Sequence, residues 1–213
     1  MDDTTGRTAH ASERPAGPPA PDRPRGAREI QDSRVLAALT HPLRRRLLDL
    51  LKVEGPATVG KLAGRTGQAV GNVSHHLKVL AESALIEEAP ELARDRREHW
   101  WRLADRELSW TRADFDGDPV AEAVADAAGS ILLERQVELV REWSARRGGY
   151  GTDWRDGCSV ATQTWLRLTP EEARELAADL HAVIQKWAHR PVPEDGRDRE
   201  TVLAFAHSVP AKP

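Results

Sequence analysis

The chain has 213 residues, enough for one large domain or two small ones, and its formal net charge of −3 identifies no partner by itself. The charge is unevenly distributed. Residues 34–106 carry 13 Lys and Arg against 9 Asp and Glu, a net of +4, whereas residues 107–213 carry a net of −6. A basic middle and an acidic second half favour two tasks in one chain, with random surface variation as the alternative. The single cysteine, Cys158, excludes an internal disulfide and a cysteine-rich zinc site.

No apolar run approaches the roughly 20 residues of a membrane-spanning helix. The N-terminus has no apolar stretch of the kind found in secretory signals, so we expect a soluble, cytoplasmic protein with no membrane partner. Residues 1–28 hold five prolines and almost no large apolar side chains, which predicts a disordered tail. A DNA-contacting arm is the alternative, but the near-neutral charge of this tail disfavours it.

Helical spacing of apolar residues begins at Ile30, and Val35, Leu36 and Leu39 share one face. A second helix starts at Pro42, a residue suited to the first helical position because no amide hydrogen bond is needed there. Its apolar stripe contains Leu43, Leu47, Leu50 and Leu51, and Gly55-Pro56 ends it.

A short helix and a longer one follow. Thr58 is a candidate cap for the short helix, whose buried side holds Val59, Leu62 and Ala63, and Gly64 and Gly67 bracket the turn after it. In the longer helix, Val73, Leu77 and Leu80 are spaced to form one buried face, and Val70 extends that face backward. The opposite, polar side carries Gln68, Asn72, His75 and Lys78.

Two short strands are predicted next, at residues 84–89 and 98–104. The loop between them carries Arg94, Arg96 and Arg97, and the adjacent Trp100 and Trp101 alternate on the second strand, so one of them packs on the helices. Three helices followed by a hairpin with arginines at its tip are typical of a winged helix-turn-helix. In such a domain the second helix of the motif enters the major groove, which is about 12 Å wide.

The chemistry of these side chains fits duplex DNA. Gln68 and Asn72 can bond bidentately to adenine, and Ser74 and His75 can contact base edges or phosphates. The arginines of the hairpin would neutralise phosphates beside the groove or reach into the minor groove.

The segments "ALTHPLRRRLLDLL", "VGKLAGRTG", "NVSHHLKVLAESALIEE" and "EHWWRL" together resemble the winged helix-turn-helix of ArsR-type bacterial transcriptional regulators. The resemblance covers about residues 34–110. It implies a symmetric homodimer that binds a palindromic operator and usually represses. The recognition positions implied here are Gln68, Ala69, Asn72, Ser74 and His75, and the wing is Arg94 through Arg97. Together with Lys78 on the polar side of the helix, the predicted DNA-binding residues are Gln68, Ala69, Asn72, Ser74, His75, Lys78, Arg94, Arg96 and Arg97.

The resemblance does not extend to metal sensing. Metal-sensing members carry a cysteine pair in the helix before the recognition unit, or acidic and histidine ligands in a terminal helix, and "RRRLLDLL" has neither Cys nor His. His75 and His76 point about 100° apart on a helix, which argues against a shared metal. His76 fits a partly buried, hydrogen-bonded structural residue better. For Arg44, Arg45 and Arg46 we favour a solvated helix face over phosphate contact for at least two of the three.

A long helix is predicted from Pro119 to about Trp143, with an early stripe of Val120, Val124, Ala127 and Ile131. Such a helix after a winged domain favours packing against its twin in a dimer, and the small Ala127 and Ala128 would permit close approach. Packing within the monomer is the alternative.

The rest of the chain predicts a strand, a helix and a strand. Residues 158–168 alternate, and Thr169, Pro170 and Glu172 form a strong helix-start signal with a capping box. Leu176, Leu180, Ile184 and Trp187 give that helix an apolar face, and residues 200–210 are the final strand. This region fits an effector pocket for an unidentified small molecule, an added dimer surface or a scaffold, and the sequence does not choose among them.

We therefore expect a mainly α fold: a winged helix-turn-helix DNA-binding domain at residues 29–112, then a long dimerisation helix and a small α+β region at 113–213. The predicted function is transcription regulation, as a repressor, by a homodimer on double-stranded DNA. A winged-helix protein-interaction module without DNA binding is the alternative. No cofactor, metal site or catalytic set is predicted, because no phosphate-binding glycine loop, zinc-protease histidine pair or nucleophile elbow is present.

Overall fold

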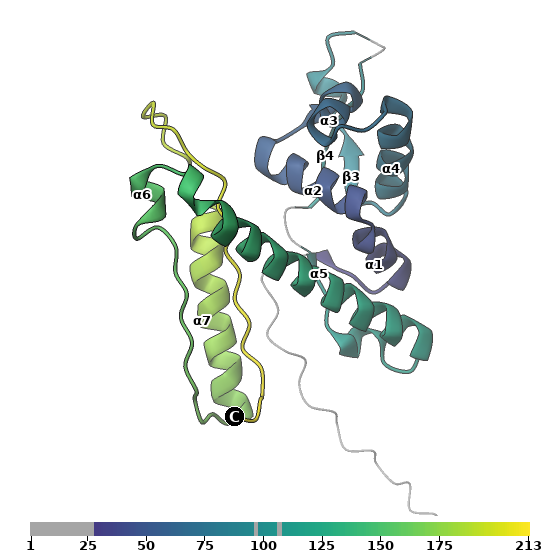
Figure 1. Cartoon of the computed structure of the whole chain (residues 1–213). Coiled ribbons are helices and arrows are strands. Elements are labelled where there is room, and N and C mark those ends of the chain that lie inside the picture. Colours follow the sequence, from purple (N-terminus) through teal and green to yellow (C-terminus); the bar gives the residue numbers. More distant parts are fainter. Residues whose placement is uncertain (1–27, 96–97, 106–107) are drawn as a thin grey trace, which may run out of the picture.

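The computed structural model describes residues 28–95, 98–105 and 108–213 (Figure 1). Its first part is a winged helix-turn-helix, as predicted, in which four helices precede a small hairpin. The helices are α1 (Ser33–Thr40), α2 (Pro42–Glu54), α3 (Val59–Thr66) and α4 (Val70–Glu82). The predicted tail, residues 1–28, lies outside the described residues except for Arg28.

The wing belongs to a three-stranded antiparallel sheet. Strand β4 (Trp100–Leu103) lies between β2 (Ala57–Thr58) and β3 (Ile86–Glu88), so the two expected strands are joined by a short third one from the loop before α3. The 3-10 turn η1 (Pro90–Leu92) lies in the wing, and a separate parallel pair joins β1 (Arg28–Glu29) to β5 (Leu108–Ser109).

The core is shared by all four helices and the sheet. The largest side chains that are almost wholly enclosed are Leu36, Leu47, Leu62, Val73, Leu77, Leu80 and Ile86. Side-chain caps fix where the helices begin. Thr58 accepts a hydrogen bond from the N–H of Lys61, as its sequence position predicted, and the ring of His41 accepts one from the N–H of Leu43. The α4 helix is held against α2 and α3 by this apolar core.

Helix α5 (Pro119–Arg146) follows the 3-10 turn η2 (Arg112–Phe115) and begins where the sequence predicts. Its first half packs on α1, and the residues buried there are Ala121, Ala125 and Ala128. The close approach expected of Ala128 is therefore made within the monomer, whereas Ala127 is exposed. Gly129 follows directly after the last buried residue of this helix.

The C-terminal part contains the 3-10 turn η3 (Arg147–Gly149), α6 (Thr152–Arg155) and α7 (Pro170–Ala188). The predicted capping box at the start of α7 is present. Thr169 accepts from the N–H of Glu172, and Glu172 accepts from the N–H of Thr169. The prediction of strands at residues 158–168 and 200–210 is wrong. Both segments lack backbone hydrogen bonds to a neighbouring strand within the described chain.

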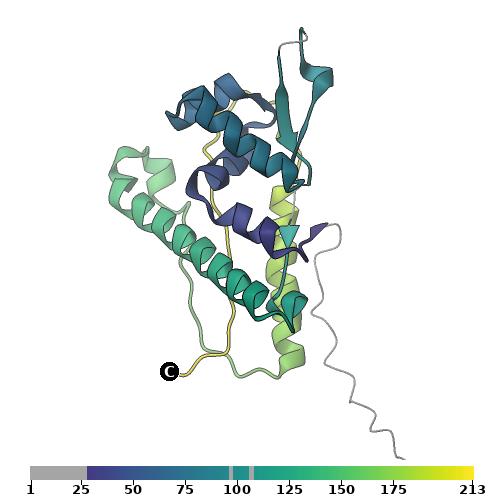
Figure 2. The ribbon, with the colours of Figure 1, turned by 90° about the vertical axis from the view of Figure 1, so that its right-hand side faces the viewer.

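Figures 1 and 2 show how these elements are arranged. Helix α5 crosses the molecule from the winged domain to α6. The segment that enters α7 and the segment that leaves it both run alongside α7, in the direction opposite to that of α7. Within the described residues, no helix is long and apolar enough to cross a membrane.

Candidate nucleic-acid interface

The turn between α3 and α4 sets the angle of the candidate recognition helix. Gly67 ends α3 in the left-handed conformation, with φ 68° and ψ 23°, and its N–H bonds to the carbonyl of Ala63. This backbone region favours glycine because it has no Cβ to clash. The turn expected at Gly67 is present, but Gly64, expected on its other side, lies inside α3. Ala69 then caps α4 with extended backbone and no side-chain hydrogen bond, which leaves the first N–H groups of α4 without a side-chain acceptor.

The inner face of α4 is the one predicted, with one exception. Val73, Leu77 and Leu80 have exposed fractions of 0% and pack into the core. Val70 was expected to extend this face, and that prediction is wrong because its side chain is 57% exposed. It lies in the first turn of the helix, where no element of the described fold covers it.

The predicted recognition side chains lie on the outer face of α4 and on the two residues before it. All of them are exposed: Gln68, Ala69, Asn72, Ser74, His75 and Lys78. Two are joined, because the Nδ2 of Asn72 donates to the Oε1 of Gln68 at 3.0 Å. The pair still presents the Oδ1 acceptor of Asn72 and the amide donors of Gln68. Lys78 lies 3.9 Å from Glu82 in an exposed ion pair, so its ammonium group remains accessible to other anions.

The wing is less basic than its tip suggests. Between residues 87 and 102 there are five acidic and four basic side chains. Arg102 lies 2.7 Å from Glu87 and also contacts Glu91, so its charge is neutralised within the wing. Arg94 is exposed, and its backbone N–H lowers the pKa of Glu98 by donating to the carboxylate. Arg96 and Arg97 lie outside the described residues.

His41 stacks on His76, a buried residue of α4, and no sequence pattern predicts this pair. The rings of His41 and His76 are 4.4 Å apart between centroids, and the exposed His75 ring is 5.4 Å from His76. His76 is buried as predicted, but its Nδ1 has no hydrogen-bond partner among the described residues, contrary to the expected hydrogen bond. Burial, and then the neighbouring His41 and Arg44, lower the pKa of His76. Burial followed by Arg44 lowers the pKa of His41.

The arginine run in α2 serves the fold. Arg44 donates to the carbonyls of Ala37 and Ala38 at the end of α1, at 3.1 and 2.7 Å. Arg45 lies 3.6 Å from Asp49, and Arg46 donates to the carbonyl of Arg65 at 3.3 Å. All three side chains have a partner within the protein, and that of Arg45 is an exposed ion pair like that of Lys78. The described residues also contain no group of three or more His, Cys, Asp or Glu arranged to hold a metal ion.

Comparison with known proteins gives the following similarities. A winged helix-turn-helix domain from Mycobacterium bovis, described as homodimeric and as a possible ArsR-family transcriptional regulator, is 24% identical over 57% of this chain and 87% of its own, with a TM-score of 0.31. A possible transcriptional regulator for arsenical resistance is 29% identical over 49% of this chain and 93% of its own, with a TM-score of 0.30. ZitR from Lactococcus lactis is 19% identical over 71% and 86%, with a TM-score of 0.31.

No similar protein was found among curated proteins. A family model described as "Helix-turn-helix domain" matches residues 39–89. This range runs from the end of α1 to the end of β3, so it includes α3, the Gly67 turn and the whole of α4. Residues 39–89 of this chain are a helix-turn-helix domain.

Proposed function

We propose that this protein is a transcriptional regulator, acting as a repressor, that binds operator DNA as a homodimer. One observation carries the proposal: α4 is anchored by Val73, Leu77 and Leu80, and its polar outer face is exposed. A helix held in this way can enter the major groove without disturbing the core. A chain with this function would act in the cytoplasm.

The joined pair Gln68 and Asn72 supports base reading. Asn72 can accept a hydrogen bond from the N6 of adenine through Oδ1 and donate to N7 through its second amide hydrogen. The bond to Gln68 holds the Asn72 side chain in place before it meets DNA, which lowers the entropy lost on binding. Ser74, His75 and Lys78 lie further along the exposed surface and would contact bases or phosphates.

Phosphate contact would supply the sequence-independent part of the affinity. Lys78 and Arg94 are exposed, and Arg96 and Arg97 follow Arg94 in the same loop. The net charge of +4 over residues 34–106 supports this assignment. The DNA-binding domain would span residues 29–112, and residues 113–213 would hold the dimerisation helix and a region with room for an effector site.

Helix α5 has a surface for the second subunit. Its buried alanines face α1, whereas the predicted stripe remains largely uncovered: Val120 is 73% exposed and Ile131 is 41% exposed. Two such stripes packed together would bury apolar area and relate two copies of α4 by a two-fold axis, which matches a palindromic operator.

The test is selection of bound DNA from a random duplex library by the purified protein, followed by binding measurements at several salt concentrations. We expect a palindromic site with two half-sites, and an affinity that falls as salt rises. Arg96→Ala should weaken binding to all DNA and reduce the slope of log affinity against log salt by about one unit. Recovery of no enriched sequence would contradict the proposal.

A second candidate is a protein-interaction module without DNA binding, and the mixed charge of the wing favours it. Glu88, Glu91 and Glu98 lie beside the arginines, and a phosphate backbone would repel them. The salt dependence distinguishes the two candidates, because a protein partner of mixed charge would not reproduce the steep linear decline expected for polyanionic DNA.

A further inference from the structure

The C-terminal unit, defined here as residues 157–213, buries no side chain among the described residues. Eleven large apolar side chains between Val160 and Val209 are exposed, among them Val160 at 90% and Trp165 at 59%. Even the apolar face of α7 is only half-buried, and Trp187 at its end is 61% exposed. Ordering a unit of this size costs conformational entropy that this small burial does not offset, so the unit requires a covering surface.

The backbone of the two extended segments of the unit, residues 159–168 and 201–209, has no partner either among the described residues. Within the described chain, no backbone hydrogen bond joins either segment to another element. Both segments are extended and run alongside α7 (Figures 1 and 2). Extended segments with free N–H and C=O groups are templates for pairing with a further strand.

The sequences of the two segments favour pairing over solvation. Residues 158–168 contain one charged side chain, Arg167, and residues 201–209 contain no Asp, Glu, Lys or Arg. Neither range contains proline, and both are rich in β-branched and aromatic residues. Natural proteins usually protect exposed edges with lysine, proline or a bulge, and these segments lack all three within the described chain.

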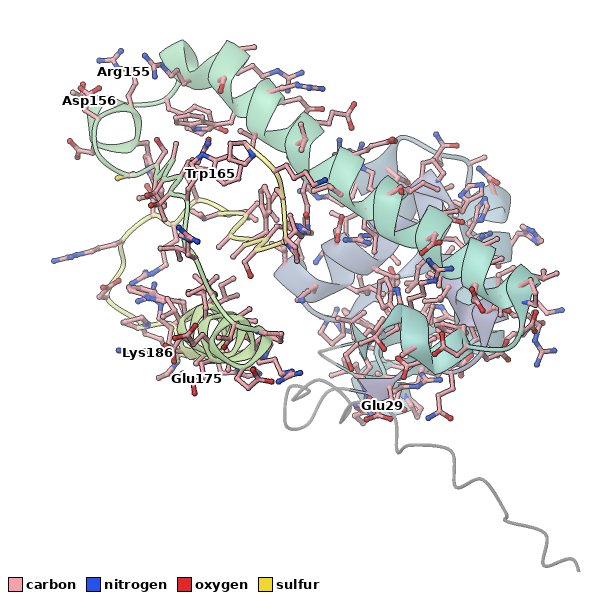
Figure 3. All side chains as sticks on the ribbon, turned by 90° about the horizontal axis from the view of Figure 1, so that it is seen from below. Glu29, Arg155, Asp156, Trp165, Glu175 and Lys186 are labelled. Carbon is pink, nitrogen blue, oxygen red and sulfur yellow. The ribbon has the colours of Figure 1, made fainter. Side chains whose placement is uncertain are left out.

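One difference between the two segments indicates which of them is free to pair with a further strand. The later segment is tied to its own chain, because the ring Nε2 of His207 lies 2.9 Å from the Oε1 of Gln136 in α5. Every residue of the earlier segment, 159–168, is exposed and free of such a tie. Figure 3 shows Trp165 on this earlier segment, whereas the charged Glu175 and Lys186 lie on the side of α7 turned away from α5.

We propose that the C-terminal unit docks on the same unit of a second copy of this chain. Segment 159–168 pairs antiparallel with the same segment of the second copy across a two-fold axis. Segment 201–209 takes no part in this strand pair. Pairing of a strand with itself about a two-fold axis closes after two copies and does not extend into a filament. The inference rests on the proposed homodimer, because α5 leads directly into this unit and dimerisation through α5 would hold the two units at high local concentration.

The available apolar area is sufficient for a stable contact. Four of the eleven side chains, Val160, Trp165, Leu166 and Leu168, lie in the paired segment itself. At on the order of 100 Å² each, all eleven give an upper bound of about 1,000 Å² per copy and about 2,000 Å² in total, reached when α7 and segment 201–209 also contact the second copy, and this lies at the lower end of obligate homodimer interfaces. A small ligand would cover only part of this surface. Each chain also carries a matching edge, so the second copy supplies the missing partner without a further component.

The test is a cysteine scan. Cys158→Ser removes the single native thiol, and single cysteines are then introduced one at a time at positions 160 to 168, followed by oxidation with copper(II) phenanthroline. Antiparallel self-pairing places only the residue nearest the axis about 5 Å from its counterpart, within disulfide reach. Each step away from it adds about 7 Å, so cross-linking should peak at one or two adjacent positions. Glu175→Cys and Lys186→Cys are the controls, and we expect no cross-link from them.

A second measurement separates this inference from the proposed function. Removal of residues 157–213 leaves the whole core between Ile30 and Ala128, so the shortened chain folds, and its dimer dissociation constant should rise at least 10-fold in sedimentation equilibrium. A protein that binds DNA as a dimer but gives no cross-linking peak, and whose dimer is unchanged by truncation, overturns the inference alone. A chain that is monomeric and does not bind DNA overturns both.

Discussion

Residues 30–128 contain every buried hydrophobic side chain of the described chain, whereas residues 129–213 contain none. The difference is not one of composition, because four of the seven tryptophans lie in the second region. The two regions differ in whether one layer of secondary structure covers another. In the first region α1 to α4, the first half of α5 and a sheet enclose a common interior. In the second region the rest of α5, α6, α7 and two extended segments enclose none. An amphipathic pattern therefore specifies a helix, and a core forms only where a second layer covers it.

A matched pair of leucine substitutions should give the largest difference in stability between the two regions. Leu77→Ala removes a side chain with an exposed fraction of 0%, so the free energy of unfolding should fall by about 2–5 kcal/mol. Leu180→Ala in α7 removes a half-buried side chain and should cost less than about 1.5 kcal/mol in the monomer. Urea denaturation followed by circular dichroism measures both. Equal losses would contradict the contrast in burial.

Asn72→Ala tests the surface of the first region, where function and stability separate. Binding to the selected DNA site should weaken by about 1–3 kcal/mol, because a bidentate base contact is lost. The free energy of unfolding should change by less than about 0.5 kcal/mol, because the side chain is exposed. Gel shifts on selected and random DNA measure the effect, with the exposed Gln31→Ala before α1 as the matched amide control. An equal loss on both DNAs would exclude base reading by Asn72.

Between pH 8 and 5, acid should destabilise the first region through His41 and His76. In the folded protein burial lowers the pKa values of His41 and His76, so below the ordinary histidine value of 6.5 the unfolded chain binds more protons than the folded one. The contribution of these two histidines to the free energy of unfolding is fully present above pH 6.5 and is lost as the pH falls toward 5. Calorimetry of the helix-turn-helix transition between pH 5 and 8 measures this, and His76→Leu should flatten the decline. A melting temperature that rises toward pH 5 would contradict the assignment.

The two threonine caps give the smallest expected difference. Thr58→Ala and Thr169→Ala each remove one side-chain hydrogen bond to a backbone N–H, a loss of about 0.5–2 kcal/mol. In α3 the loss should appear in the global free energy of unfolding, because that helix is packed. In α7 it should appear as helix content lost before the main transition, since no side chain of that helix is buried. Circular dichroism during thermal melting distinguishes the two.

The sequence predicted local structure well where side chains act on their own backbone. The capping box at Thr169, the cap at Thr58, the glycine turn at Gly67 and the start of α5 at Pro119 are confirmed. Each depends on residues a few positions apart. The buried face of α4 was predicted for the same reason, because helical periodicity places Val73, Leu77 and Leu80 on one side.

Predictions that required a partner element were less successful. Val70 has the correct periodicity for burial, but nothing packs against the first turn of α4. Ala128 is buried as its size suggested, yet against α1 of its own chain. The stacking of His41 on His76 joins residues 35 positions apart, which periodicity cannot detect. The recognition and wing residues remain a prediction, since exposure permits DNA contact without demonstrating it.

Gly129 lies where the two regions meet. It is inside α5 immediately after Ala128, the last buried residue of this helix, and a Cβ at this position would meet no atom within 4 Å. A glycine inside a helix is about 1 kcal/mol less favourable than alanine, and no close contact here requires it. The interior of the continuous helix therefore has its lowest intrinsic helix propensity directly after its buried face ends.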